Sequence, residues 1–97
     1  HFCVNLLSSR DEGMANSFAG RDGKTGAEKF QLGSWIALQS GAPALASALA
    51  SLDCEVVETV EAHTHTVFFG AVREIRRGEG LAPLLHFARQ YRNLADK

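Results

Sequence analysis

Two long segments in the second half of the chain alternate apolar and polar side chains with a period of two, which is the pattern of β-strands. In residues 48–62 the apolar face holds Leu52, Cys54, Val56, Val60 and Ala62, and the polar face holds Asp53, Glu55, Thr59 and Glu61. Val57 and Glu58 interrupt the alternation, so we expect a β-bulge there. Residues 65–76 form a second strand with a β-branched and aromatic centre, and a turn follows at residues 77–80. The fold must therefore be built around two long strands.

Shorter elements surround these strands. Residues 2–7 are apolar and end at a serine pair, which predicts a strand. Ser9 and Glu12 have the spacing of a capping box, so we expect a helix that runs to about Ala19 and ends at Gly20. The other segments predict a glycine-rich loop at 20–26, a helical turn at 27–30, a strand at 35–38, a turn at 40–43, a strand at 84–87 and a polar tail at 89–97 that is compatible with a helix. Strands dominate, so the expected architecture is a small antiparallel β-barrel.

Composition narrows the classes of function. The chain has 97 residues, 45% of them apolar, and a formal net charge of -1, which suits one small domain. Positive and negative residues are interspersed, so neither a nucleic-acid-binding stripe nor a polybasic membrane contact is predicted. Cys3 and Cys54 lie far apart, which favours two buried thiols in a reducing cytoplasm. The chain opens inside an apolar strand, whereas termini are usually polar, so we expect further residues to precede it.

Few residues specify chemistry by themselves. His63 and His65 would share a strand face, and with His86 they could bind a divalent metal; a partly exposed strand entry without metal is the alternative. Arg21 and Lys24 in the glycine-rich loop could contact an anion, but the loop lacks the complete phosphate-binding motifs. No serine or cysteine sits in a nucleophile motif. The carboxylates along residues 48–62 lie mostly at the spacing of a solvent-exposed face, and we expect them to be solvated: Asp53, Glu55, Glu58 and Glu61.

The order of segments along the chain is more specific than any one motif. The segments are FCVNLL at 2–7, FAG at 18–20, KF at 29–30, ALASLDC at 48–54, HTVFFGAV at 65–72 and PLLHF at 83–87, followed by Tyr91. This series resembles the short-chain flavin reductase family, which includes the reductase components of two-component flavin-dependent monooxygenases of the 4-hydroxyphenylacetate 3-monooxygenase type. The resemblance covers essentially all 97 residues.

The resemblance implies an FMN-binding split β-barrel of Greek-key topology, of which residues 1–97 would be the C-terminal portion of a single domain. It implies a homodimer that transfers a hydride from NADH or NADPH to FMN or FAD. The reduced flavin would then pass to a partner monooxygenase. Because flavin and nicotinamide carry the hydride chemistry themselves, no catalytic side chain is expected. A flavin-binding or haem-binding split barrel without catalysis is the alternative.

The resemblance also assigns site residues. On the flavin side it implies Asn5, Leu6, Leu7 and Ser8 at a strand end, Asp11 or Glu12 at a helix start, and Phe18, Ala19 and Gly20 closing over the ring. A plain core role is the alternative for Phe18. On the nicotinamide side it implies His65, His86, Phe87, Ala88, Arg89 and Tyr91. His63-Thr64 stands where the family often has Gly-Asp, and Ala88-Arg89-Gln90 stands where a more basic run is common. Both departures lie on the nicotinamide side, so the choice between NADH and NADPH stays open.

Overall fold

The computed structural model describes residues 1–21, 23, 26–79 and 82–94. In chain order its elements are β1 (Phe2–Leu6), α1 (Glu12–Phe18), the 3-10 helix η1 (Gly26–Gln31), β2 (Trp35–Ala37), β3 (Pro43–Leu45), β4 (Ala50–Ala62), β5 (His65–Arg77), β6 (Leu85–Phe87) and β7 (Gln90–Arg92). Within the described ranges the strands form sheets β1-β4-β5, β2-β3 and β6-β7, and every pairing is antiparallel. None of the described helices has the length and apolar composition needed to cross a membrane. The prediction of a mainly β chain with short helices is confirmed.

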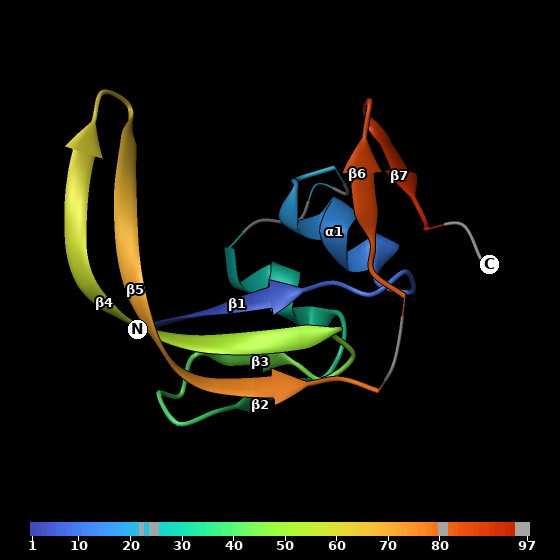
Figure 1. Cartoon of the computed structure of the whole chain (residues 1–97). Coiled ribbons are helices and arrows are strands. Elements are labelled where there is room, and N and C mark those ends of the chain that lie inside the picture. Colours follow the sequence, from blue (N-terminus) through green and yellow to red (C-terminus); the bar gives the residue numbers. More distant parts are fainter. Residues whose placement is uncertain (22, 24–25, 80–81, 95–97) are drawn as a thin grey trace.

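The two long strands β4 and β5 pair with each other as a hairpin. The pairing runs from Ala50 opposite Arg77 to Ala62 opposite His65. A register shift between Val56 and Glu58 leaves Val57 unpaired, so the predicted bulge lies where the alternation breaks. Figure 1 shows the outer part of this hairpin, residues 57–69, rising from the body as an arm.

The hydrophobic core is small and lies between α1 and the segment that leads from β3 into β4. Its buried members are Met14, Leu45 and Ala48, and the partly buried Leu7, Leu32 and Trp35 pack against them. Small domains bury a modest share of their surface. Hydrogen bonds between side chains and backbone add to this packing, as where the N–H of Leu45 donates to the side chain of Asn5 at 2.9 Å.

The start of α1 differs from the predicted capping box. Asp11 is the N-cap residue, and no side chain caps the helix in the way predicted for Ser9 and Glu12. Instead, the Asp11 carboxylate accepts hydrogen bonds from the backbone N–H and the hydroxyl of Ser8, at 2.8 and 2.9 Å. Ser8 and Asp11 are both buried, and burial favours a pair that is satisfied internally over one that water could satisfy. Gly20, at φ 80°, ends the helix as predicted.

The C-terminal tail is not helical over the residues that the structure describes. Gln90–Arg92 forms β7 and pairs with Leu85–Phe87 of β6, while 95–97 lie outside the described residues. The connecting residues Ala88 and Arg89 have φ values of 52° and 66°, as in the two-residue turns that match hairpin twist. The polar composition of this segment reflects an exposed hairpin, which composition does not distinguish from an exposed helix.

One member of the predicted solvent-exposed carboxylate face is buried. Asp53 is 1% exposed, and its carboxylate accepts hydrogen bonds from the backbone N–H of Ser40 at 2.8 Å and from the Ser40 hydroxyl. Glu58 and Glu61 are exposed, and Glu55 pairs with Arg73 at 2.8 Å. The loop between β2 and β3 therefore covers the polar face of β4 near its start. The turn predicted at 40–43 supplies Ser40, but the local pattern of β4 could not reveal that this loop folds over it.

Candidate functional site

Asn5 joins three strands through its side-chain amide. Its Oδ1 accepts hydrogen bonds from the backbone N–H of Leu45 at 2.9 Å and from the Ser51 hydroxyl at 2.8 Å, and its Nδ2 donates to the carbonyl of Pro43 at 3.2 Å. The amide therefore pairs with β3 much as a backbone amide would, while it also bonds β4. These bonds engage Oδ1 and one hydrogen of Nδ2, which leaves the second Nδ2 hydrogen and the backbone of Asn5 for a ligand.

The end of β1 is tied into the protein through its backbone. The carbonyl of Leu6 accepts from the N–H of Leu49 at 2.7 Å, and the carbonyl of Leu7 accepts from the N–H of Leu84 at 3.0 Å. One carboxylate oxygen of Asp11 accepts a hydrogen bond from Ser8. The other accepts a hydrogen bond from the Ser47 hydroxyl at 2.7 Å. The predicted flavin-side residues 5–8 are thus held rigidly, and each carbonyl keeps one lone pair for a further donor. Glu12 is exposed on the first turn of α1.

Phe18 belongs to an aromatic cluster at the C-terminal end of α1. Its ring lies 5.3 Å from that of Phe30 and 5.9 Å from that of Trp35, and the latter two are 4.9 Å apart. Phe18 is nevertheless 42% exposed, so it is not a plain core residue. Lys29 lies over the Phe18 ring at 5.8 Å, within range of a cation–π interaction. Ala19 and Gly20 follow as the C-cap and the left-handed turn residue.

A groove of about 310 Å³ runs between this aromatic cluster and β1. Its lining includes Phe2, Phe18, Phe30 and Trp35 on the aromatic side, with Cys3, Asn5 and Pro43. A mostly apolar groove with a few polar groups is the usual form of a site for a planar ligand. Of these aromatic residues, the resemblance implied only Phe18 as a site residue, and Phe2, Phe30 and Trp35 were not predicted. Their aromatic character was visible in the sequence, but only the packing of η1 and β2 against α1 joins them.

The C-terminal hairpin adjoins the end of α1. Arg21 lies over the Tyr91 ring at 5.7 Å, and the Tyr91 ring is 5.2 Å from that of His86. Arg21 is itself fixed to the helix by Asn16, whose side-chain oxygen accepts from its guanidinium at 3.3 Å. Arg21 was considered only as an anion contact; Lys24, its predicted companion, lies outside the described residues. The predicted residues Phe87, Ala88 and Arg89 are exposed at the hairpin end.

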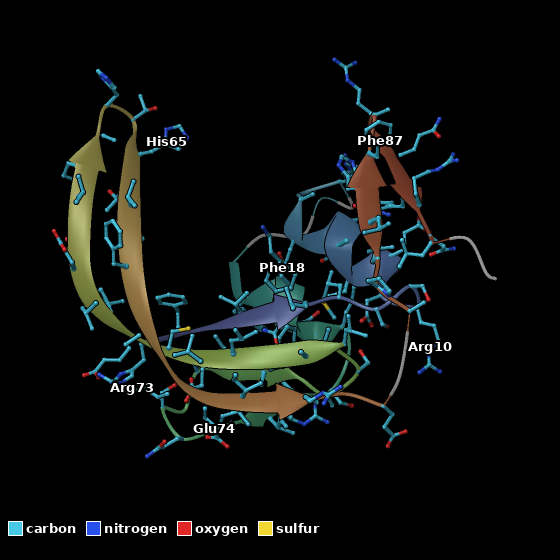
Figure 2. All side chains as sticks on the ribbon, in the orientation of Figure 1. Arg10, Phe18, His65, Arg73, Glu74 and Phe87 are labelled. Carbon is cyan, nitrogen blue, oxygen red and sulfur yellow. The ribbon has the colours of Figure 1, made fainter. Side chains whose placement is uncertain are left out.

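His65 stands apart from the other predicted site residues. It begins β5 at the tip of the arm, where its Nδ1 lies 3.0 Å from the Thr64 hydroxyl. Figure 2 shows His65 at the far end of the arm, across an open gap from Phe18 and from Phe87 on the other hairpin. His63 lies in the turn at φ 59°, off the strand. In the described part of the chain no three His, Cys, Asp or Glu side chains are grouped to hold a metal ion, so the metal site at His63, His65 and His86 is not formed.

Cys3, in the groove wall, has a thiol whose pKa lies above its ordinary value. Burial is the main cause that raises the pKa of its thiol, and the nearby Asp53 carboxylate and Cys54 raise it further. Both cysteines are free, and Cys54 is buried at 4% exposure while Cys3 is half-buried. The prediction of two buried thiols holds fully for Cys54 and partly for Cys3.

We expect Cys3 to react with iodoacetamide more slowly in the folded protein than in denaturant at the same mildly alkaline pH, because only the thiolate is nucleophilic. The pKa of the Cys3 thiol is higher in the folded protein than its ordinary value. The thiol therefore contributes its full stabilisation below the unfolded-state pKa, and this stabilisation is lost as pH rises through the folded-state pKa. Peptide-level mass spectrometry measures the rate, with Cys3→Ser as the control. Equal rates in the folded and unfolded protein would show that the thiol is not shielded.

Known proteins similar to this chain include several flavin reductases. The family model of the flavin reductase like domain matches residues 1–95. A protein of Methylorubrum extorquens (strain PA1), FMN reductase (NADH) RutF 2, is 42% identical over 92 residues, which are 95% of this chain and 52% of that protein. The chain spans about half the length of the curated relatives it matches.

Two solved structures share the fold over nearly the whole chain. The NADH:FAD oxidoreductase SgcE6 of Streptomyces globisporus C-1027, solved with NAD and FAD fragments, is 28% identical with a TM-score of 0.81, covering 96% of this chain and 55% of that one. A homologue of nitrilotriacetate monooxygenase component B from Mycobacterium thermoresistibile is 26% identical with a TM-score of 0.82, covering 96% of this chain and 51% of that one. The predicted split-barrel fold is therefore confirmed. Because one family model matches almost every residue, the chain belongs to the flavin reductase-like domain family, as the order of its segments predicted.

Proposed function

We propose that the protein containing this domain is an NADH:FMN oxidoreductase, which transfers a hydride from the reduced nicotinamide to the flavin. The observation that carries the proposal is the identity of 42%, across 95% of this chain, to a protein named FMN reductase (NADH). The NAD and FAD fragments in the SgcE6 structure favour the same pair of cofactor classes. We name FMN rather than FAD, and NADH rather than NADPH, because the relative is named FMN reductase (NADH).

The residues present fit a flavin ring. The groove beside β1 offers apolar aromatic surface from Phe18, Phe30 and Trp35, and its polar lining comes mainly from Asn5. When bound, the flavin supplies the hydride acceptor, so the chain's own groups need only bind, orient and exclude water. In this proposal Phe18 packs on the ring, and the fixed end of β1 lies along the ring edge. The exposed residues of β6 and β7 enclose the nicotinamide nucleotide.

The experiment that tests the cofactor part is a titration of the intact protein with FMN, followed through the quenching of flavin fluorescence. We expect saturable binding with one flavin per chain. An absence of quenching at high protein concentration would contradict the proposal.

We further propose that a second copy of the chain covers the arm. Val60 is paired with Val67, and Phe69 lies two residues further on the same face, opposite the exposed Glu58. Val60, Val67 and Phe69 therefore form an apolar stripe with one carboxylate at its inner end. They are 42%, 43% and 49% exposed, and contiguous apolar surface of this kind marks interaction sites. His65 lies at the end of the same stripe. In a homodimer, the arm would carry His65 away from its own chain and toward the partner's nicotinamide residues.

We expect the intact protein to be a dimer by light scattering and Phe69→Glu to shift it to monomer, because a charge in an apolar interface is left without a partner. Thr59→Glu, which places the same charge on the other face of the arm, is the matched control and should stay dimeric. A monomeric wild-type protein, or a Phe69→Glu variant that stays dimeric, would rule out this interface.

We propose that His65 orients the nicotinamide and donates no obligatory proton. His65→Ala should then raise the KM for NADH about three- to tenfold, the value of one or so net hydrogen bond, while FMN affinity is retained. His63→Asn is the control, because Asn tolerates the left-handed conformation of that turn position. Steady-state kinetics measure both, and an unchanged KM would remove His65 from the site.

We propose that the reduced flavin passes to a flavin-dependent monooxygenase. The support is the neighbour described as component B of a monooxygenase. A location in the cytoplasm remains a prediction from the cysteines alone.

A further inference from the structure

A second pocket, of about 210 Å³, shares no lining residue with the aromatic groove. It lies where the connection between β1 and α1 meets the end of β5 and the segment before β4. Its lining consists of Arg10, Ala46, Ser47, Ala48, Arg76, Gly78 and Glu79. Pockets for whole small molecules usually measure about 300–1,000 Å³, so this one suits a small group rather than a ring system.

Arg76 is incompletely satisfied in this pocket. Its Nη2 donates to the carbonyl of Ala46 at 3.2 Å, which fixes the guanidinium against the chain. Its Nη1 is buried and has no hydrogen-bond partner in the described part of the chain. A buried donor without a partner is costly, and more so when it is charged. An acceptor that enters the pocket would remove this cost.

The charges of the pocket favour an anion. Arg10 supplies a second guanidinium from the connection before α1, and Figure 2 shows it on the side of the molecule away from the arm. Glu79 is the one acidic residue in the lining, and it is exposed. Among the described residues no ion pair joins Glu79 to Arg10 or Arg76. The nearby Asp11 carboxylate is already engaged by Ser8 and Ser47, so neither arginine is neutralised.

We propose that Arg10 and Arg76 form a binding site for a phosphate group. The planar guanidinium fork matches two phosphate oxygens, and such charge-assisted bonds are about twice as strong as neutral ones. The Nη1 donor of Arg76 bonds one phosphate oxygen, and Arg10 closes over the group from the pocket rim. The site does not depend on hydride transfer. The phosphate can be free or can belong to a nucleotide.

The test is a calorimetric titration of the intact protein with inorganic phosphate at low salt. We expect saturable binding that Arg76→Met weakens about tenfold or more, as the loss of a charged hydrogen bond implies. Arg77→Met, on the same strand with its side chain on the opposite face, is the matched control and should bind phosphate normally. Glu79→Gln removes the opposing charge and should tighten binding about two- to threefold.

Phosphate binding that is absent in the wild-type protein, or equal in Arg76→Met, overturns the proposal. Should Arg76→Met fail to fold, judged by circular dichroism, Arg10→Met replaces it. Arg10 is exposed, so its replacement leaves the fold intact and should weaken phosphate binding about threefold. Equal binding by that variant also overturns the site.

Paired ligands identify the source of the phosphate. If Arg76→Met weakens FMN but not riboflavin, the group is the flavin phosphate; if it weakens NADPH but not NADH, the group is the ribose 2′-phosphate. A loss confined to inorganic phosphate supports a site for a separate ligand. If the protein binds phosphate but does not oxidise NADH, the phosphate site is supported and the proposed reductase function is refuted. If it oxidises NADH but does not bind phosphate, the reductase function is supported and the phosphate site is refuted.

Discussion

Gly78→Ala should destabilise the domain by about 3 kcal/mol, because the new methyl group has no room and the backbone must move to admit it. A Cβ built at Gly78 meets the carbonyl oxygen of Ala48 in a clash and lies 3.0 Å from the carbonyl oxygen of Leu49. The N–H of Gly78 also donates a hydrogen bond to the carbonyl oxygen of Leu49 at 2.7 Å. A backbone shift that relieves the clash would therefore break this hydrogen bond. Urea denaturation followed by circular dichroism measures the free energy of unfolding.

Gly13→Ala is the matched control for Gly78→Ala. Gly13 lies within α1, and nothing lies within 4 Å of a Cβ at that position. Alanine is the better helix former by about 1 kcal/mol, so this variant should be more stable than the wild type. If both variants lost stability to the same extent, the close approach of Gly78 to the segment before β4 would not be the cause.

Asn5→Ala should destabilise the protein by about 2–4 kcal/mol, since it removes three hydrogen bonds that join β1, β3 and β4. The backbone N–H of Leu45 would be left without its partner, and Leu45 is fully buried. Asn16→Ala is the control, because its side chain makes one exposed hydrogen bond with Arg21 and should change stability by only about 0.5 kcal/mol. Denaturation curves compare the two variants.

Asn5→Asp separates the two halves of the Asn5 amide. It keeps the oxygen that accepts from Leu45 and loses the Nδ2 donor to Pro43. We expect an intermediate loss of stability. A loss in Asn5→Ala no larger than in Asn16→Ala would mean that β3 is held by packing alone.

The long strands were predictable because their signal is local. Alternation over a dozen residues specifies a strand, and its interruption at Val57 located the bulge correctly. The strand β3 was missed because it is three residues long and begins at Pro43, and a proline after a turn segment reads as more turn. The strand predicted at 84–87 is β6. The tail at 89–97 was ambiguous because β7 is three residues long, too short for a period to appear.

The parts of the site that depend on tertiary contacts could not be predicted. The burial of Asp53 requires the loop at Ser40 to fold over β4, and the Asp11 carboxylate at the start of α1 binds the buried Ser8 instead of capping the helix. The aromatic groove unites Phe2, Phe18 and Trp35 from three separate elements. The resemblance implied Phe18 and the segment from His86 to Tyr91 as site residues, but not that this segment forms a hairpin. It could not show that His65 stands far from them within one chain.

The most direct test of the central claim is the steady-state oxidation of NADH by the intact protein, followed through the loss of NADH absorbance, with FMN supplied or withheld. The proposed function predicts oxidation that saturates in both NADH and FMN and that falls to background without flavin. Tight flavin binding with no NADH oxidation would contradict the claim. It would instead favour a split barrel that binds its cofactor without catalysis.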